Sequence, residues 1–322
     1  ENYQMGARTT KRVIAGLAAA SLLVATNVLP ASAEDQKTVG FSPIAWAIPA
    51  MVGIQGGFNG IAASMGLKTA NAPDPNFDSA TAKKNIESWI TNKTVDGFWS
   101  ITPGVPSTLK STLELAQEKG VAAVVNGVPA DYGFSGLQKG ISFAVIDYAK
   151  EGAALGTQMG KCLVAKKLST SSIIMGVNPA GTIGKKEMEA AFQAAFKKAA
   201  PKAKIARAVA LTGDQAKQQS TIRTAIQANP KAVGIVTWTD EGALGSIAAY
   251  KTAGKKPASL CLVGAGGGDQ AKAAVKAKNL YADVALDFGA DIAQNIAELK
   301  RLMAGTGVMG KQLVTPVVVY NQ

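Results

Sequence analysis

The chain has 322 residues, a formal net charge of +12 and no histidine. Because histidine is the most frequent general base and a common zinc ligand, this composition excludes a serine–histidine triad and the usual zinc sites. Hydrophobic residues make up 47% of the chain and aromatic residues only 6%, so the cores should be built from Ala, Val, Ile and Leu, in helices packed on sheets.

The excess of basic residues is spread along the chain. Lysines are scattered over predicted helix faces and never form a block of five or six like charges. Binding to nucleic acid or to an anionic surface is favoured by clustered charge, so a solvated basic surface is the simpler explanation. We therefore expect no nucleic-acid partner.

Residues 1–33 have the composition of an export signal. Basic residues precede an apolar run that ends in small residues: Arg8, Lys11, Arg12, 13–29, Ala31, Ser32 and Ala33. Glu1–Gln4, ahead of Met5, look like residues added in cloning. The apolar run is too short and too rich in Ala for a stable membrane span, and no cysteine follows that could carry a lipid. We expect a signal peptide that is removed, no lipid anchor and a periplasmic protein.

Short β-rich runs alternate with helical stretches after this leader, as in parallel βαβ units. In the first block, strands are expected at 38–41, 67–70, 98–101, 121–125 and 141–146, with helices at 49–65, from 79 onward and at 106–120. An irregular stretch at 126–140 interrupts this alternation of strands and helices. In the second block, a helix at 148–166 precedes strands at 173–177, 205–210, 232–236, 260–264 and 281–286, and a β-branched tail lies at 317–319. Two serial α/β blocks of similar length predict two domains, each with its own core.

The two cysteines allow two interpretations. Cys162 lies in an apolar helical stretch and Cys261 in an apolar strand. An exported protein can form a disulfide, but buried free cysteines fit the same surroundings. The sequence leaves this choice open.

Two glycine-containing stretches resemble nucleotide loops only superficially. In the run from Gly264 to Gly268, the place of the third glycine of a dinucleotide fingerprint is taken by Asp269, whose charge would oppose a pyrophosphate. Near Gly184 and Lys185, the earlier glycine of a phosphate loop is Pro179. We therefore expect no cofactor.

Candidate binding residues follow the predicted strands, because ligands of open parallel sheets bind beyond the strand ends. Trp46 and Trp238 either stack on a solute through their rings or fill core space, and Trp99 is expected to be more buried because it follows Phe98. Polar candidates at other strand ends and in the irregular stretch are Asn126, Asp131, Tyr132, Asn178, Thr239, Asp240 and Asp287. The adjacent acids Asp240 and Glu241 fit a helix start better than a catalytic pair.

The segment from Ile235 to Gly245 carries the most specific resemblance. With its Trp238-Thr239-Asp240-Glu241 core, it is similar to the strand–Asn-Asp-Glu–helix signature of periplasmic solute-binding proteins of ABC importers, in the ribose/galactose-type group. That group shares its fold with LacI-type repressors. Asp147 and Gly120 also match, and the resemblance covers 37–322.

This resemblance implies an α/β fold of two doubly wound parallel-sheet lobes joined by a three-crossing hinge, known as periplasmic binding protein type I. The crossings are expected near 126–147, at Asp287 and near 307–316. The implied division assigns 34–140 and 288–310 to the N-terminal lobe, and 141–287 and 311–322 to the C-terminal lobe with its hinge crossings. The solute would be trapped when the lobes close on each other.

The family's site is only partly retained. Its early Asn-x-Pro-aromatic stretch keeps Pro49 after Trp46, its second-lobe arginine falls on Lys186, and its late polar position survives as Asp287. Its Asp-Arg pair appears as Gly127-Val128, the Asn before Asp-Glu as Thr239 and a later Asp as Gly266. Each lost charged group removes hydrogen bonds worth roughly 1.5–3 kcal/mol. A polyol, a substituted or deoxy sugar, or a more aromatic solute therefore fits better than a free sugar clamped by charged groups.

We therefore expect a monomeric, non-enzymatic receptor that captures a small sugar-like or polyol solute and delivers it to an ABC permease. Trp238→Ala should then abolish or strongly weaken binding and leave the fold intact. The alternatives are a sensor that feeds a chemoreceptor or kinase, a receptor for an aromatic or nucleoside-like solute, and an exported carboxylate-based hydrolase. A LacI-type regulator would need a helix-turn-helix ahead of the first strand, where this chain has a leader instead.

Overall fold

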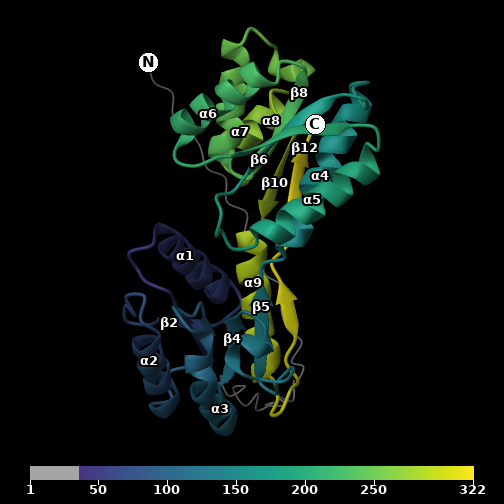
Figure 1. The fold of residues 1–322 in the computed structure, drawn as a ribbon. Helices are drawn as coiled ribbons and strands as arrows, with labels where there is room; N and C mark the ends of the chain where they lie inside the picture. Colours follow the sequence, from purple (N-terminus) through teal and green to yellow (C-terminus); the bar gives the residue numbers. More distant parts are fainter. Residues whose placement is uncertain (1–35) are drawn as a thin grey trace, which may run out of the picture. The chain divides into compact units, whose positions relative to one another are not determined.

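The computed structural model describes residues 36–322, which build two sheets, each covered by helices on both faces (Figure 1). The predicted export signal at 1–33 lies outside the described residues. Within 36–322, no helix is both long and apolar enough to span a bilayer.

The first sheet has six parallel strands in the order β11-β5-β4-β3-β1-β2. Their bounds are Thr38–Ser42 (β1), Lys68–Asn71 (β2), Gly97–Ser100 (β3), Ala122–Asn126 (β4), Ile141–Val145 (β5) and Gln312–Val314 (β11). Helices α1 (Pro49–Ser64) and α9 (Phe288–Met303) pack on one face. Helices α2 (Ser79–Thr91) and α3 (Lys110–Lys119) pack on the other.

The second sheet has the order β12-β10-β9-β8-β6-β7, and only β12 runs antiparallel to its neighbour. Its strands are Ser172–Val177 (β6), Lys204–Ala210 (β7), Ala232–Val236 (β8), Cys261–Ala265 (β9), Ala282–Leu286 (β10) and Val317–Asn321 (β12). Helices α4 (Tyr148–Ala165) and α5 (Lys185–Ala199) cover one face. The other is covered by α6 (Gln215–Ala228), α7 (Asp240–Thr252) and α8 (Asp269–Lys276).

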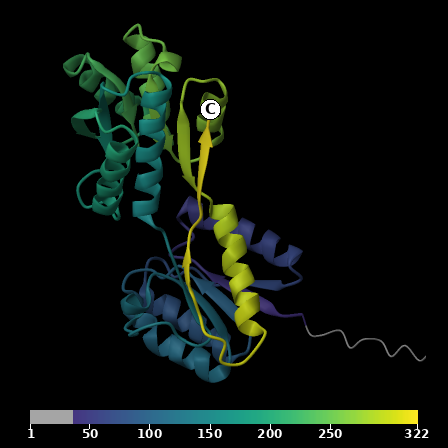
Figure 2. The same cartoon turned by 90° about the vertical axis from the view of Figure 1, so that its right-hand side faces the viewer.

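The chain passes between the two sheets three times: after β5, after β10 and between β11 and β12 (Figure 2). The segment between β11 and β12 is hydrogen-bonded both to the segment after β10 and to the end of β5. The backbone N–H of Asp287 donates to the carbonyl of Pro316 (2.8 Å), and that of Thr315 donates to the carbonyl of Val145 (2.9 Å). The crossings lie at or within the positions that the resemblance implied.

Sheet membership places the lobe boundaries differently from the sequence division. β5 and β11 both belong to the first sheet, whereas the division grouped 141–146 and 311–316 with the second lobe. The reason is the hydrogen-bond ladder: β5 pairs with β4 from Ile141 to Ala144, so the chain leaves the sheet only after Val145. The irregular stretch at 126–140 precedes β5, so the chain crosses between the sheets after this stretch and not within it.

Helices α4 and α5 approach closely because α4 carries glycine at every fourth position on the face toward α5. A Cβ built on Gly152 would lie 2.1 Å from the carbonyl oxygen of Met188, and one on Gly156 would lie 2.3 Å from that of Phe192. On Gly160, it would lie 2.4 Å from the Cβ of Ala199. Residues one turn apart share a helix face, so the three glycines form one line along which the backbones meet.

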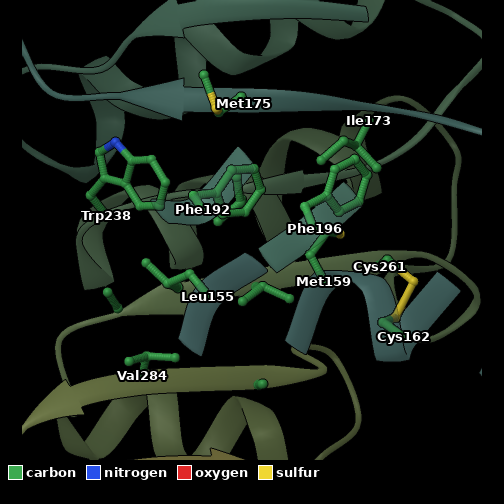
Figure 3. Packing of buried hydrophobic residues seen from close by; sticks show 14 of the residues in the cluster. Leu155, Met159, Cys162, Ile173, Met175, Phe192, Phe196, Trp238, Cys261 and Val284 are labelled. Carbon is green, nitrogen blue, oxygen red and sulfur yellow. A yellow bond between two sulfur atoms is a disulfide. The ribbon is translucent and has the colours of Figure 1, made fainter. Parts of the chain in front are cut away.

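Cys162 of α4 and Cys261 of β9 form a disulfide, with their Cα atoms 5.7 Å apart (Figure 3). Both side chains are fully buried in the cluster that also contains Met159 and Phe196. The structure thereby selects one of the two interpretations that the sequence allowed.

Candidate functional site

Each sheet has one point where the strand order reverses. In the first sheet, β1 lies between β2 and β3, and in the second, β6 lies between β7 and β8. At each reversal, the connections that follow two neighbouring strands, β1 and β3 in the first sheet and β6 and β8 in the second, lead to helices on opposite faces of the sheet. A crevice therefore opens between them at the carboxyl ends of these strands. The connections after β1 and β3, and those after β6 and β8, therefore border the candidate site on each lobe.

Trp46 lies in the connection after β1 and is half-buried. Its indole N–H donates to the carbonyl oxygen of Ala72 (3.0 Å), and its backbone N–H donates to Asp74 Oδ1 (3.1 Å). The ring meets Phe41 edge-on, with 5.9 Å between centroids. Since the polar atom of the indole is already bonded, the ring face is the part of Trp46 that can meet a solute.

Three of the sequence-predicted residues in the first lobe are brought together. Asn126 Oδ1 accepts a hydrogen bond from the indole of Trp99 (2.7 Å), and the hydroxyl of Tyr132 donates to the carbonyl of Asn126 (2.7 Å). Tyr132 is fully buried, which raises the pKa of its hydroxyl, so its role here is structural. Asp131 is exposed and accepts from the backbone N–H of Val128 (2.9 Å). The Asn126 amide nitrogen is then the polar atom that can serve a solute.

Trp238 follows β8 and is only 8% exposed. Its ring packs edge-to-face on Phe192 of α5, with 5.4 Å between centroids (Figure 3). Its Nε1 is buried and has no hydrogen-bond partner among the described residues. Replacing a buried Trp by Ala costs about 3–5 kcal/mol. The expectation that Trp238→Ala leaves the fold intact is therefore corrected: α5 covers this strand end, and the ring is part of the core.

The other predicted polar residues of the second lobe divide into two groups. Thr239 and Asp287 cap helices: Thr239 Oγ1 accepts from the N–H of Gly242 (3.1 Å) and Asp287 Oδ1 from that of Ala290 (2.9 Å). Asn178, in the connection after β6, is half-buried, and Lys186, in the first turn of α5, is exposed. These last two are free to face a solute at the strand reversal.

Asp240 is paired with a second carboxylate, Asp283, which sequence reasoning missed. Asp240 Oδ2 accepts from the N–H of Gly268 (2.7 Å), and Asp283 Oδ2 accepts from the N–H of Gly267 (2.9 Å). The Oδ1 atoms of both residues are buried and accept no hydrogen bond from any other described residue, and the two carboxyl groups are hydrogen-bonded to each other. Burial and the charge of Asp240 raise the pKa of Asp283 to about 7, and burial also raises the pKa of Asp240.

Replacing Asp283 with Asn should weaken the pH dependence of the unfolding free energy. The ordinary pKa of an aspartate is 3.8 and that of Asp283 in the folded chain is about 7, so the folded state binds this proton more tightly than the unfolded state does. Its contribution to stability is fully present below about pH 4 and is lost as the pH rises through about 7. Asn retains an acceptor for Gly267 and cannot ionise.

Urea denaturation at several pH values measures this effect. The variant should have a higher free energy of unfolding than the wild type, and the difference should be larger at pH 8 than at pH 5. Some pH dependence should persist because burial also raises the pKa of Glu151 to about 7. If the free energies of unfolding of the variant and the wild type differ by the same amount at every pH, Asp283 does not bind a proton with a raised pKa in the folded state.

The hollows of the described surface are not all at the strand reversals. Open hollows of about 620 and 780 Å³ lie at the amino edge of the first sheet, where Gly120 and Val121 precede β4. A smaller one of about 240 Å³ lies at the carboxyl edge of the second sheet, lined in part by Gln215, Asp240 and Glu241. Since ligands of open α/β sheets bind at carboxyl edges, the larger hollows are not the favoured site.

Two doubly wound lobes connected by three crossings define a two-lobed binding protein. The chain belongs to the periplasmic binding protein domain family, whose profile matches residues 39–306. This confirms the resemblance and the fold class expected from the sequence, and it agrees with the expected role of a solute receptor. No match was found among curated protein sequences.

Solved structures of the same fold cover most of the chain. A solute-binding protein from Actinobacillus succinogenes with bound D-allose has 14% identity and a TM-score of 0.66, covering 89% of this chain and 98% of its own. The arabinose-transporter binding protein of Shewanella sp. ANA-3, bound to L-arabinofuranose, has 21% identity and a TM-score of 0.61, covering 88% and 91%. A periplasmic ribose ABC transporter protein of Conexibacter woesei has 19% identity and a TM-score of 0.64, covering 89% and 92%.

Proposed function

We propose that this protein is an extracytoplasmic receptor that captures a small sugar-like or polyol solute between its two lobes and delivers it to an ABC permease. The observation that carries the proposal is the pair of strand reversals, each bordered by residues that suit a saccharide. The ring face of Trp46 and the amide of Asn126 belong to the first lobe, and Asn178 and Lys186 to the second. Aromatic faces match the apolar face of a sugar ring, and amides and amines match its hydroxyls.

The proposed mechanism is a shift between open and closed arrangements of the lobes. A solute that contacts both lobes binds the closed arrangement more tightly, so its binding energy favours closure. The crossing segments have the construction that a hinge needs, since Asp147 and Asp287 each cap the helix that follows a crossing. In this proposal the protein is an exported monomer without a lipid anchor, it needs no cofactor, and it releases the solute unchanged.

One observation, the Asp240–Asp283 pair, favours the alternative function of an exported carboxylate-based hydrolase. A general acid needs a raised pKa, and Asp283 has one. However, the Oδ1 atoms of both residues are buried, whereas a catalytic carboxyl group must reach its substrate. Recovery of the bound solute unchanged after long incubation supports the receptor, and a cleaved product supports the hydrolase.

A thermal-shift screen against pentoses, hexoses, polyols, glycosides and nucleosides tests the proposed ligand class. A ligand that binds only the folded state stabilises it by about 2.7 kcal/mol at a concentration of one hundred times Kd. We expect a saccharide or polyol to raise the melting temperature in a concentration-dependent way. A shift with nucleosides alone, or with none of these compounds, would contradict the proposal.

Trp46→Ala should weaken binding of that ligand by about tenfold, because it removes the ring face that can stack on the solute. Trp46→Phe, which keeps an aromatic face but loses the indole N–H, should retain most of the affinity. Calorimetric titration of the two variants separates the contribution of the ring from that of its bond to Ala72. If the Ala variant binds as tightly as the wild type, Trp46 does not contact the solute.

A further inference from the structure

Large hydrophobic side chains are exposed at the carboxyl edge of the first sheet. Phe77, Val105 and Val128 follow β2, β3 and β4 in turn, and they are 55%, 61% and 38% exposed. Single exposed hydrophobic residues are common, but these three all lie on connections that leave the carboxyl ends of strands, the edge of the sheet where this fold binds ligands.

The backbone of Phe77 is in the left-handed region, with φ of 64°, and that of Asn76 has φ of 48°. Asn tolerates this conformation, but a bulky aromatic residue rarely adopts it. In residues 36–322, the other non-glycine residues with positive φ are Lys93, Lys167 and Lys278, which follow the ends of helices. A left-handed residue closes a helix there, a reason that does not apply to Phe77, which precedes α2.

Hydrogen bonds hold this unfavourable backbone against the connection that carries Trp46. The N–H of Phe77 donates to the carbonyl of Ile44 (3.1 Å), and the carboxylate of Asp74 accepts from the N–H groups of Trp46 (3.1 Å) and Asn76 (2.9 Å). The Trp46 indole closes the set through its bond to Ala72. A strained conformation that its surroundings fix so fully is most often found at functional sites.

We propose that Phe77 is a second aromatic platform of the solute site, fixed beside the Trp46 connection, and that it receives an apolar substituent of the solute. This inference rests on the proposed function and specifies its ligand class: a saccharide or polyol that bears an aryl or alkyl group. The first lobe has the composition for such a ligand, because Val105 and Val128 add apolar surface while Tyr132 is buried and bonded within the protein.

A purely structural role for Phe77 makes the opposite prediction. Phe77 immediately precedes Asp78, the residue that caps α2, and a hydrophobic residue at this place can pack on the first turn of the helix. If that packing were its role, removing the ring would destabilise the free protein. If the ring serves a ligand, Phe77→Gly relieves the backbone strain and leaves the free protein as stable as the wild type or more so.

The experiment compares the phenyl and methyl glycosides of the sugar that gives the largest thermal shift. By calorimetric titration, the wild type should bind the phenyl glycoside about tenfold more tightly than the methyl glycoside. Phe77→Gly should lose this preference, binding the methyl glycoside as before, and should melt no lower than the wild type. Phe77→Tyr should keep the preference. Val164→Ala, which trims an equally exposed residue on α4 (54%), is the matched control and should bind as the wild type does.

Two outcomes overturn the inference alone: a wild type without preference for the phenyl glycoside, or a Phe77→Gly variant that keeps the preference. A lower melting temperature with unchanged preference would assign the ring to the structural role. Failure of every saccharide and polyol to bind the wild type would overturn the proposed function, and this inference with it.

Discussion

Removing the Cys162–Cys261 disulfide is expected to lower the free energy of unfolding of the second lobe by about 4–5 kcal/mol. The two cysteines are 99 residues apart in sequence, so the bond closes a long loop in the unfolded chain. A cross-link of this length restricts the unfolded ensemble strongly, and its loss favours unfolding. Urea denaturation of the double variant Cys162→Ala/Cys261→Ala measures the change, with a signal from the second lobe such as the fluorescence of Trp238.

The reductant dithiothreitol provides the control for this prediction. It should shift the wild type toward the midpoint of the double variant and leave the double variant unchanged. A double variant with the midpoint of the oxidised wild type would show that the cross-link adds nothing to stability.

Gly156→Ala should destabilise the second lobe by about 3 kcal/mol, although Ala is normally the better helix residue. The new methyl group would lie 2.3 Å from the carbonyl oxygen of Phe192 and 2.9 Å from the backbone nitrogen of Phe196. Both contacts are with backbone atoms, which cannot rotate away as a side chain can. Helices α4 and α5 would have to separate, and the cluster between them, which includes Leu155 and Phe192, would lose packing.

Gly56→Ala in α1 is the matched control. It makes the same chemical change inside a helix, but nothing lies within 4 Å of the new methyl group. There the substitution should stabilise the protein by about 0.5–1 kcal/mol, because Gly loses more backbone entropy on folding than Ala. Calorimetric scans of both variants test the opposite signs. If both raise the melting temperature, the helices are not in close contact through Gly156.

Most of the fold follows from local patterns in the sequence. The alternation of short β-rich runs with helical stretches predicted ten of the strands, most of which are buried parallel strands with a continuous apolar run. Two features were out of reach of that reasoning. β11 is only three residues long, and β12 is antiparallel, a direction that its composition does not encode.

The candidate site was harder to predict because the exposure of a side chain depends on distant segments. Trp46 and Trp238 both follow strands, but Trp238 is covered by Phe192 of α5, more than forty residues earlier in the chain. The disulfide was left open for the same reason, since only the packing of α4 on β9 brings the cysteines together. Asp283 was overlooked, although a carboxylate within the apolar run Ala282–Leu286 is a visible signal of a buried polar contact.

Small-angle X-ray scattering of the protein with and without its ligand tests the central claim most directly. The claim is that one solute is held by both lobes, so saturation with the saccharide or polyol from the thermal screen should close the lobes and reduce the radius of gyration. The reduction should follow the same saturation curve as the calorimetric titration. A radius of gyration that stays constant while the ligand saturates the protein would contradict the claim.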